Sequence, residues 1–432
     1  MACKPAHRKQ FMQINHSFKG FPGHQMPVDI SQIGLQKWHV LKGDLPLPLA
    51  VIKEKALAHN LQWMKDFCEK RQLDIAPHGK TTMSPELYAR QLEAGAWGIS
   101  FANVFQASLG IRHGVQRVII ANQVYQQADL QALSVLLTTY PDVRVYFLVD
   151  SAEQIDAIQK WRGSSQSDIA FTVLIELGIE GKRTGCREHS QAMALARKIK
   201  ATTGLLLCGI ECYEGALATC NHEHDQASVA ALMGRVQQLA VACEKENLFE
   251  NDEILLTAGG SAIFDVVAQH LKPQLHLPTR GILRSGCYVT HDHVQYRKML
   301  KCVGERLQLT ETLRPALEVI SSVQSCPEPG LALLTMGKRD VSYDMDLPVA
   351  IWRANIGDQG VTGVPSHWEI TALNDQHAYL QFNPAASASE QPHVGQLIGS
   401  GISHPCTTFD KWRWMPVVDD HYAVISAVSI CF

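Results

Sequence analysis

Lys80 is the residue of this sequence whose type and position best suit chemistry. It stands in DIAPHGKTTMSPEL, where a short apolar run is followed by a Pro-His-Gly break and then by Ser-Pro-Glu. This order predicts a strand, a turn and a capped helix start, so we expect Lys80 at the mouth of a sheet or barrel, where ligands collect. A buried amine there can lose its proton and attack a carbonyl. The segment alone favours an ordinary solvated lysine, and the rest of the chain reverses that preference.

Two glycine turns are candidate phosphate sites. Gly259, Gly260 and Ser261 follow the apolar run EILL in TAGGS, and Gly286 and Cys287 follow another apolar run in RSGCY. Glycines let backbone N–H groups approach an anion, and a following helix would add a favourable dipole. Either motif alone indicates only a tight turn. Together, at the ends of successive late strands of a barrel, they predict phosphate binding.

Arg183 and Tyr213 are the candidates for contact with a bound ring. Arg183 lies in LIELGIEGKRTGC, which also holds Glu176, and Tyr213 lies in GIECYEG. An arginine is ordinarily a surface charge, but here it could point inward and fix the electronics of a ring. A tyrosine is ordinarily a buried aromatic, and its hydroxyl would contact a ring bound at this site. Both alternatives stay open at this point.

His404 and Cys406 in SHPC form a candidate metal pair. In an extended strand, residues i and i+2 point to the same face, so both side chains can converge on one ion, and imidazole with thiolate suits zinc. Two protein ligands leave positions for water or substrate, which favours a catalytic metal over a structural one. The alternative is a buried cysteine beside a surface histidine. A second pair with the same spacing, His291 and His293, ranks lower because it follows a strand end and can simply line the pocket.

The composition is that of a globular protein. The chain has 432 residues, 46% of them hydrophobic, and a net charge of −3, which gives no general attraction to nucleic acid or to an anionic membrane. The N-terminal residues have no apolar core of a signal peptide, and no apolar run is long enough to span a bilayer. The 12 cysteines show no paired spacing, which suits free thiols in a reducing compartment. We therefore expect a cytoplasmic protein with neither a membrane nor a nucleic-acid partner.

The elements that must position these residues change in character along the chain. In residues 46–300, apolar β-rich runs alternate with helical stretches, which indicates a parallel sheet covered on both faces. With about eight such units, an α/β fold of the (β/α)8 TIM-barrel type is expected. Residues 301–432 show short strands joined by Gly, Pro, Asn and Asp turns, which predicts a second, mostly antiparallel β-domain. Residues 1–45 match neither pattern, and we expect a mobile end plus a strand contributed to the β-domain.

Taken together, these motifs resemble the D-serine dehydratase and D-threonine aldolase family, which are pyridoxal-phosphate enzymes of the alanine racemase type (fold type III). The resemblance implies an alanine-racemase-like barrel with a β-domain, and a homodimer with its active site near the subunit interface. It is carried by PHGKTTMSPEL, LEAGAWGISFANVFQA, KRTGC, TAGGS, RSGCYV and SHPCTTFDKWRWMPVVDDHY.

The resemblance also implies roles for individual residues. Lys80 would be bound covalently to pyridoxal 5'-phosphate, and the two glycine turns would supply phosphate-binding amides and a hydroxyl. Arg183 and Tyr213 would lie close to the cofactor ring or its substituents. His404 and Cys406 match the metal pair of the D-serine dehydratases, whereas the aldolase branch more often carries an aspartate at the second ligand. Cys406 therefore favours dehydration.

The implied reaction is β-elimination from a β-hydroxy-D-amino acid such as D-serine, which gives a 2-keto acid and ammonia. A divalent ion, with zinc as the first candidate, would act as a Lewis acid on the departing oxygen. The main alternative is retro-aldol cleavage to glycine and an aldehyde with the same cofactor and metal. A racemase fits less well because two-base racemisation needs no metal pair, and a non-catalytic pyridoxal-phosphate carrier would lack the β-domain. The sequence does not choose among D-serine, D-threonine and 3-hydroxyaspartate.

Overall fold

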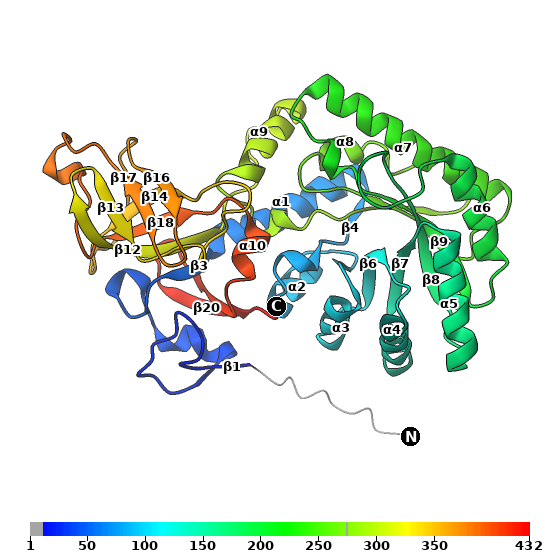
Figure 1. Cartoon of the computed structure of the whole chain (residues 1–432), viewed down its shortest axis with the longest axis horizontal. Helices are drawn as coiled ribbons and strands as arrows, with labels where there is room; N and C mark the ends of the chain where they lie inside the picture. Colours follow the sequence, from blue (N-terminus) through cyan, green and yellow to red (C-terminus); the bar gives the residue numbers. More distant parts are fainter. Residues whose placement is uncertain (1–11, 274) are drawn as a thin grey trace. The chain divides into compact units, whose positions relative to one another are not determined.

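The computed structural model of the protein describes residues 12–273 and 275–432. These residues form two compact units, each assembled from distant parts of the chain (Figure 1). The first unit combines residues 12–58, 290–295 and 314–432. The second combines the described residues of 59–289 with residues 296–313.

The second unit is a barrel of eight parallel strands, joined in the order β4-β11-β10-β9-β8-β7-β6-β5. Backbone contacts also connect the two end strands, because the amide of Ser100 donates to the carbonyl of Pro77 (2.9 Å) and His78 pairs with Ser100 as a parallel bridge. The (β/α)8 barrel expected from the sequence is therefore confirmed. In chain order its strands are β4 (Asp74–Ile75), β5 (Ile99–Phe101), β6 (Arg117–Gln123), β7 (Arg144–Val149), β8 (Phe171–Leu177), β9 (Leu205–Cys212), β10 (Ile254–Ala258) and β11 (Thr279–Leu283).

Helices lie outside the barrel strands (Figure 1). Several begin where the sequence supplies a cap: the Ser84 hydroxyl accepts the amide of Leu87 in α2, and Asn103 and Asn221 cap α3 and α7 in the same way. Such caps satisfy backbone donors that a helix leaves without partners. The helices are α1 (Glu54–Arg71), α2 (Pro85–Glu93), α3 (Val104–Arg112), α4 (Gln127–Thr139), α5 (Ala152–Ser165), α6 (His189–Lys200), α7 (His222–Lys245), α8 (Phe264–Val267) and α9 (Gln295–Leu307). Short 3-10 turns are η3 (Gly79–Thr81), η4 (Gly215–Leu217) and η5 (Cys287–Val289).

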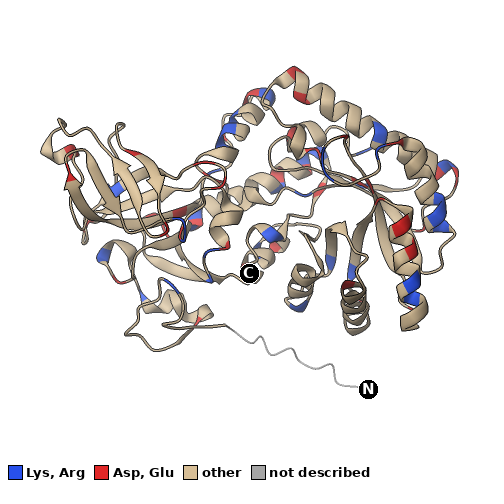
Figure 2. Cartoon of the chain, viewed as in Figure 1, with Lys and Arg blue, Asp and Glu red and all other residues tan. Residues whose placement is uncertain are grey.

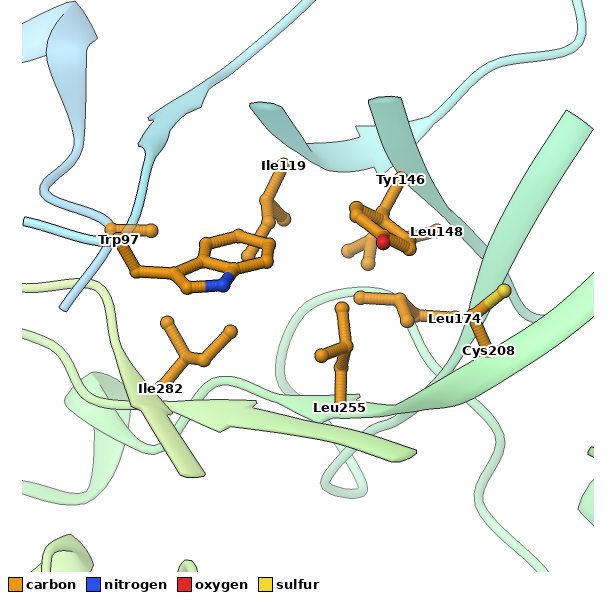
Figure 3. Packing of buried hydrophobic residues seen from close by; sticks show 9 residues of the cluster. Trp97, Ile119, Tyr146, Leu148, Leu174, Cys208, Leu255 and Ile282 are labelled. Atoms are coloured by element: carbon orange, nitrogen blue, oxygen red, sulfur yellow. The ribbon is translucent and has the colours of Figure 1, made fainter. Parts of the chain in front are cut away.

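A hydrophobic cluster fills the inside of the barrel (Figure 3). The indole of Trp97 extends toward the side chains of Ile119 and Ile282, and Leu255 faces Leu174 in the same layer. Side chains from alternate positions of neighbouring strands thus make a packed core rather than a channel. The cluster consists of Ala76, Trp97, Ile119, Tyr146, Leu148, Leu174, Cys208, Leu255 and Ile282.

The first unit is built on a mostly antiparallel ten-stranded sheet, which confirms the predicted β-domain. Its longest strand, β12, pairs with β18 and β3 over its first half and with β13 over its second half. The strands are β3 (Leu49–Lys53), β12 (Leu317–Glu328), β13 (Leu331–Leu334), β14 (Val349–Ala354), β15 (Thr362–Gly363), β16 (Glu369–Leu373), β17 (Ala378–Gln381), β18 (Leu397–Gly401), β19 (Trp414–Val418) and β20 (Val424–Ser429). One short helix, α10 (Pro405–Phe409), follows β18.

The expectation that the barrel begins near residue 46 is wrong. Strand β3 pairs with β12 and β19 of the antiparallel sheet, and the first barrel strand is β4. A buried strand of a parallel barrel and a buried inner strand of an antiparallel sheet can have the same apolar sequence pattern as β3. Periodicity alone therefore cannot distinguish these two kinds of strand. The later boundary differs as well, because residues 301–313 belong to the barrel unit.

The N-terminal segment joins the β-domain unit without entering its large sheet. Its strand β1 (Gln13–Ile14) pairs with β2 (Val28–Asp29) in a separate small sheet. The indole of Trp414 in β19 donates to the carbonyl of Lys19 (2.9 Å), and the Lys19 amine pairs with Asp340 (2.8 Å). The mobile end expected before this segment lies outside the described residues.

Charged residues of both signs are interspersed along the helices of the barrel unit (Figure 2). The net charge of the whole chain is −3. Within residues 12–273 and 275–432, no helix combines the length and apolar character needed to cross a bilayer.

Gly209 in β9 marks a place where the barrel has no room for a side chain. It lies opposite Leu255 of β10, and a Cβ atom on it would fall far inside contact distance of the Leu255 carbonyl oxygen. We expect Gly209→Ala to lower the free energy of unfolding by about 3 kcal/mol, because a clash with backbone cannot be relieved by rotating a side chain. Urea unfolding followed by circular dichroism measures this change.

Gly163→Ala is the matched control for that substitution. Gly163 lies exposed in α5, and nothing stands within 4 Å of a Cβ built on it. Because alanine is the better helix former, this change should raise the free energy of unfolding by about 0.5–1 kcal/mol. Equal unfolding midpoints for the wild type and Gly209→Ala would contradict the close approach of β9 and β10.

Candidate active site

Lys80 lies at the carboxyl end of β4, in the turn η3 between that strand and α2. Its side chain is half-buried. Gly79 precedes it because no side chain fits there: a Cβ would be 2.7 Å from the ring of Phe101. The hydroxyl of Tyr88 in α2 donates to the Gly79 carbonyl (2.9 Å). Strand and helix together therefore fix the backbone that carries the Lys80 amine.

The turn after β11 packs directly on the lysine turn. A Cβ on Gly286 would be 2.7 Å from both the carbonyl oxygen of His78 and the hydroxyl of Thr81. The sulfur of Cys287 lies 4.0 Å from the same hydroxyl. Gly286 therefore allows two backbone turns to touch, and this places one predicted phosphate turn beside Lys80.

The glycine turn after β10 already binds an anionic side chain. The amides of Gly259 and Gly260 donate to the carboxylate of Glu214, at 2.9 Å and 2.6 Å. The Gly260 carbonyl accepts from the Ser285 hydroxyl (3.0 Å), which joins this turn to the one after β11. Paired amides of this kind suit anions. The helix expected to follow, α8, has only 4 residues, so the dipole suggested by the sequence is small.

A buried ion pair stands at the same end of the barrel. Arg284, with 4% of its side chain exposed, pairs with Glu211, with 2% exposed. The Arg284 guanidinium also donates to the Thr257 hydroxyl (2.8 Å) and the Cys212 carbonyl (3.1 Å). Burial raises the pKa of Glu211 to about 8, although the positive charge of Arg284 opposes this shift. Sequence reasoning gives neither residue a role, and the available signal is an arginine directly after the apolar run GIL.

Arg183 and Tyr213 lie together as a cation–π pair. The guanidinium carbon of Arg183 is 4.9 Å from the centroid of the Tyr213 ring, within the range of this interaction. Arg183 is exposed and Tyr213 is half-buried. Tyr213 also borders the glycine turn, because a Cβ on Gly260 would be 3.2 Å from its ring. Burial, and then the neighbouring Glu214 carboxylate, raises the pKa of the Tyr213 hydroxyl.

Glu176 at the end of β8 lines a pocket with Arg183 and Tyr213. Its carboxylate accepts hydrogen bonds from the Thr184 hydroxyl (2.9 Å) and the Gln123 amide (2.5 Å). Burial raises the pKa of Glu176, while these two hydrogen bonds act in the opposite direction. The segment that carries Arg183 is thus tied back to the barrel strands.

The imidazole of His78 lies close to several positive charges at the barrel mouth. Burial lowers the pKa of its imidazole well below the ordinary value, and the positive charges of Lys80, Arg284 and Arg183 add to the effect. Within the described part of the chain, its buried Nδ1 has no hydrogen-bond partner. Burial and the three nearby positive charges therefore both favour the neutral form of this imidazole.

His404 and Cys406 belong to the first unit, and their local geometry corrects the extended strand inferred from the sequence. Strand β18 ends at Gly401, His404 is the cap residue of α10, and Cys406 lies in the first turn of that helix. Pro405 at the first helical position explains the difference, because its fixed φ starts a helix. The two side chains still meet, as hydrogen-bond partners.

Asp344 holds the imidazole of His404. Its Oδ2 lies 2.7 Å from His404 Nδ1, and its Oδ1 accepts from the Thr407 hydroxyl (2.6 Å). A carboxylate on Nδ1 leaves Nε2 as the nitrogen for a metal ion, as is typical of metal-binding histidines. Burial lowers the pKa of His404, but hydrogen bonds to Cys406 and Asp344 outweigh it and raise the pKa to about 9. Asp344 lies 60 residues from His404, so no local spacing could identify it.

Within the described residues, no group of three or more His, Cys, Asp or Glu side chains is placed to hold a metal ion. The role of His404 and Cys406 as metal ligands therefore stays a prediction. The rival pair lies in the same unit, where the ring of His293 packs against Gly401 and His291 is buried.

The structure brings the predicted cofactor residues together at one end of the barrel and places the predicted metal ligands in the other unit. Direct contacts connect the lysine turn to the turn after β11, that turn to the one after β10, and the latter to Tyr213 and Arg183. The roles given to these residues stay predictions. The barrel set is Lys80, Arg183, Tyr213, Gly259, Gly260, Ser261, Gly286 and Cys287, and the β-domain pair is His404 and Cys406.

Comparison with solved structures shows the same fold in two enzymes. The D-threonine aldolase of Filomicrobium marinum superposes with a TM-score of 0.72 at 21% identity, covering 90% of this chain and 95% of that one. The D-threo-3-hydroxyaspartate dehydratase of Delftia sp. gives a TM-score of 0.72 at 19% identity, covering 91% and 99%. Structures of that dehydratase include a histidine-to-alanine variant and, two positions further on, a cysteine-to-alanine variant in the metal-free form.

Sequence comparison agrees with the structural one. The chain is 24% identical to the D-threonine aldolase of Arthrobacter sp over 374 residues, which are 86% of this chain and 89% of the relative. The serine dehydratase domain model matches residues 316–418, and the alanine racemase N-terminal domain model matches residues 52–289. The resemblance inferred from the motifs is thereby confirmed. Matched over more than half of its length, the chain belongs to the alanine racemase N-terminal domain family, and a serine dehydratase domain follows in the sequence.

Proposed function

We propose that the protein is a pyridoxal-phosphate-dependent lyase that converts a β-hydroxy-D-amino acid, D-serine being the simplest, into a 2-keto acid and ammonia. The names of its relatives support this class, because D-threonine and D-threo-3-hydroxyaspartate are both D-amino acids with a β-hydroxyl group. Two reactions are open to such a substrate. One breaks the Cα–Cβ bond next to the hydroxyl group, and the other removes the hydroxyl group itself. The residues of the predicted metal pair support loss of the hydroxyl group.

Three features of the barrel mouth suit pyridoxal 5'-phosphate. Lys80 offers a half-buried amine, Gly286 allows the turn after β11 to pack against the lysine turn, and the Ser285 hydroxyl joins that turn to the glycine turn after β10. Lys80 would bind the aldehyde, the turns would receive the phosphate, and Arg183 and Tyr213 would border the ring. When bound, this cofactor supplies a ring that takes up the electron pair released at the substrate Cα.

Lys80 would have a second role, because its Nζ would be the base that removes the proton from the substrate Cα when cofactor and substrate are bound. Over the whole reaction, that proton and the β-hydroxyl would leave the substrate as one molecule of water. A second molecule of water would then release the amino group as ammonia and leave the 2-keto acid.

The observation that carries dehydration is the His404 and Cys406 pair, with Asp344 behind the histidine. The same residue types with the same spacing were replaced in the Delftia dehydratase, and its cysteine variant is described as metal-free. An imidazole together with a thiolate suits a divalent ion, and zinc is the first candidate. Such an ion would act as a Lewis acid on the β-oxygen, which leaves poorly as hydroxide.

Retro-aldol cleavage is the second candidate, because the curated D-threonine aldolase aligns over 86% of this chain. It would use the same lysine and ion, but would break the Cα–Cβ bond and release glycine and an aldehyde. The substrate class, the homodimer and the cytoplasmic location stay predictions.

Lys80→Ala tests the covalent link. We expect the visible absorbance of the lysine-bound cofactor to disappear and turnover to fall by at least about a thousand-fold, because the variant lacks both the amine that binds the aldehyde and the base. Absorbance spectra and peptide mapping after borohydride reduction measure this. The exposed Lys272, replaced by alanine, is the control and should keep the band. A band of normal height in Lys80→Ala would eliminate the assignment.

Cys406→Ala separates the metal from the cofactor. The variant should keep the visible band, lose its bound divalent ion and turn over about a hundred-fold more slowly, because Lewis-acid assistance is worth several kcal/mol. Metal analysis of the purified protein and an assay of keto acid measure both effects. Cys326→Ala, an exposed thiol in β12 of the same unit, is the control and should change neither. Full metal content in Cys406→Ala would contradict the proposed ligand.

Product analysis decides between the two reactions. With D-serine, D-threonine and D-threo-3-hydroxyaspartate, we expect keto acid and ammonia in equal amounts, and no release from the L-isomers. A coupled dehydrogenase assay for keto acid and a colour assay for aldehyde can be run on the same samples. Glycine with an equal amount of aldehyde from D-threonine would instead establish the aldolase reaction.

A further inference from the structure

Glu214 is a buried carboxylate for which the proposed reaction has no use. It directly follows Tyr213 after β9, and its side chain is 0% exposed. Oε2 accepts the amide of Gly259 (2.9 Å) and Oε1 accepts the amide of Gly260 (2.6 Å). Both of its oxygens are therefore engaged by the two amides that the sequence assigned to phosphate.

We propose that Glu214 is a positioning residue that fixes the Gly259–Gly260 turn, and that the phosphate is received one step further on, by the amides of Ser261 and Gly286. This inference rests on the proposed function, since it names the donors for the phosphate of the cofactor. It moves the phosphate contacts away from the two glycines that the sequence favoured.

The packing around Glu214 supports a carboxylate that stays in place when a ligand binds. Its backbone carbonyl accepts the amide of Leu217 in η4 (2.8 Å). The next residue, Gly215, lies directly under the Tyr213 ring, where a Cβ would clash with the hydroxyl. Rotation of the Glu214 side chain out of this place would therefore disturb Tyr213, the proposed ring contact. It would also leave the amides of Gly259 and Gly260 without their acceptor.

Electrostatic repulsion also argues against a phosphate on the Gly259 and Gly260 amides. A phosphate on the Gly259 and Gly260 amides would lie against the Glu214 carboxylate, and like charges that close disfavour each other. If Glu214 keeps its two amides, the phosphate must bind to other donors of the two turns. Gly259 has a φ of +105°, a conformation that is open mainly to glycine. The Glu214 carboxylate therefore stabilises a turn conformation that most other residue types could not adopt.

Ser261 and Gly286 are the neighbouring donors. Within the described part of the chain, neither amide donates to a protein acceptor. Ser261 directly follows the Gly259–Gly260 turn. Gly286 packs on the lysine turn, because a Cβ atom placed on it would be 2.7 Å from the carbonyl oxygen of His78. The hydroxyl of Ser285 ties the two turns together through the Gly260 carbonyl (3.0 Å). An anion between these turns would lie next to Lys80.

Hydrogen exchange of the cofactor-free protein tests the clamp. In the wild type we expect slow exchange in the peptide that covers residues 257–263, and in Glu214→Ala exchange at least about tenfold faster, because two amides lose their acceptor. Glu214→Gln keeps the shape of the side chain but only one acceptor oxygen, so its exchange rate should lie between those of the wild type and Glu214→Ala. Glu223→Ala, an exposed carboxylate in the first turn of α7, is the control and should match the wild type. Equal exchange in all four proteins would overturn the clamp.

Titration with pyridoxal 5'-phosphate tests the position of the phosphate. We expect the dissociation constant to rise by about tenfold or more in Glu214→Ala, to rise less in Glu214→Gln and to stay unchanged in Glu223→Ala. An unchanged or lower value in the two Glu214 variants would mean that the carboxylate competes for the phosphate amides, and would overturn the inference. Failure of the wild type to bind the cofactor would refute the proposed function, whereas the exchange experiment would still decide the clamp.

Discussion

The position of Lys80 depends on backbone hydrogen bonds that the preceding segment makes to strands on both sides. β4 is only 2 residues long, but the chain beyond it stays bound: the Ala76 amide donates to the Leu283 carbonyl (2.8 Å), and the Ser100 amide donates to the Pro77 carbonyl (2.9 Å). Because a buried backbone group without a partner is costly, these bonds determine the path of the chain up to the turn. The lysine is therefore positioned by the closed barrel itself, and the turns after β10 and β11 are placed relative to it by the same set of strands.

The charged groups at the barrel mouth differ in the partners that they have inside the protein. Arg284 pairs with Glu211, and its positive charge opposes the rise that burial causes in the Glu211 pKa. Glu214 is compensated by two backbone amides, which carry no net charge. In the part of the chain that the structure describes, neither Lys80 nor Arg183 forms an ion pair, although the Glu176 carboxylate lines the same pocket as Arg183. A phosphorylated aldehyde offers both an electrophile for the amine and the negative charge that such a site favours.

The barrel and the lysine turn were predictable because they depend on local sequence. Apolar runs, a proline after a serine and glycines after strands each act within a few residues. β3 was misplaced because an apolar strand buried between two neighbours has the same pattern in either sheet. The partners that define the site's chemistry are different: Glu214 reaches Gly259 across 45 residues, and Asp344 reaches His404 across 60. Such contacts depend on how the fold brings distant segments together, and no spacing within a single chain reveals them.

The backbone that carries the predicted metal pair is fixed by residues other than His404 and Cys406 themselves. The His404 amide donates to the Ser342 hydroxyl (3.0 Å), and the Thr408 hydroxyl donates to the His404 carbonyl (3.1 Å). Pro405 then starts α10, so the side chain at position 406 leaves the helix in one direction whatever its type. A thiolate or a carboxylate at that position would meet the same imidazole, but with a different affinity for the ion and a different effect on its acidity. The fold thus sets the backbone geometry, and under the proposed function the residue type at position 406 would tune the Lewis acid.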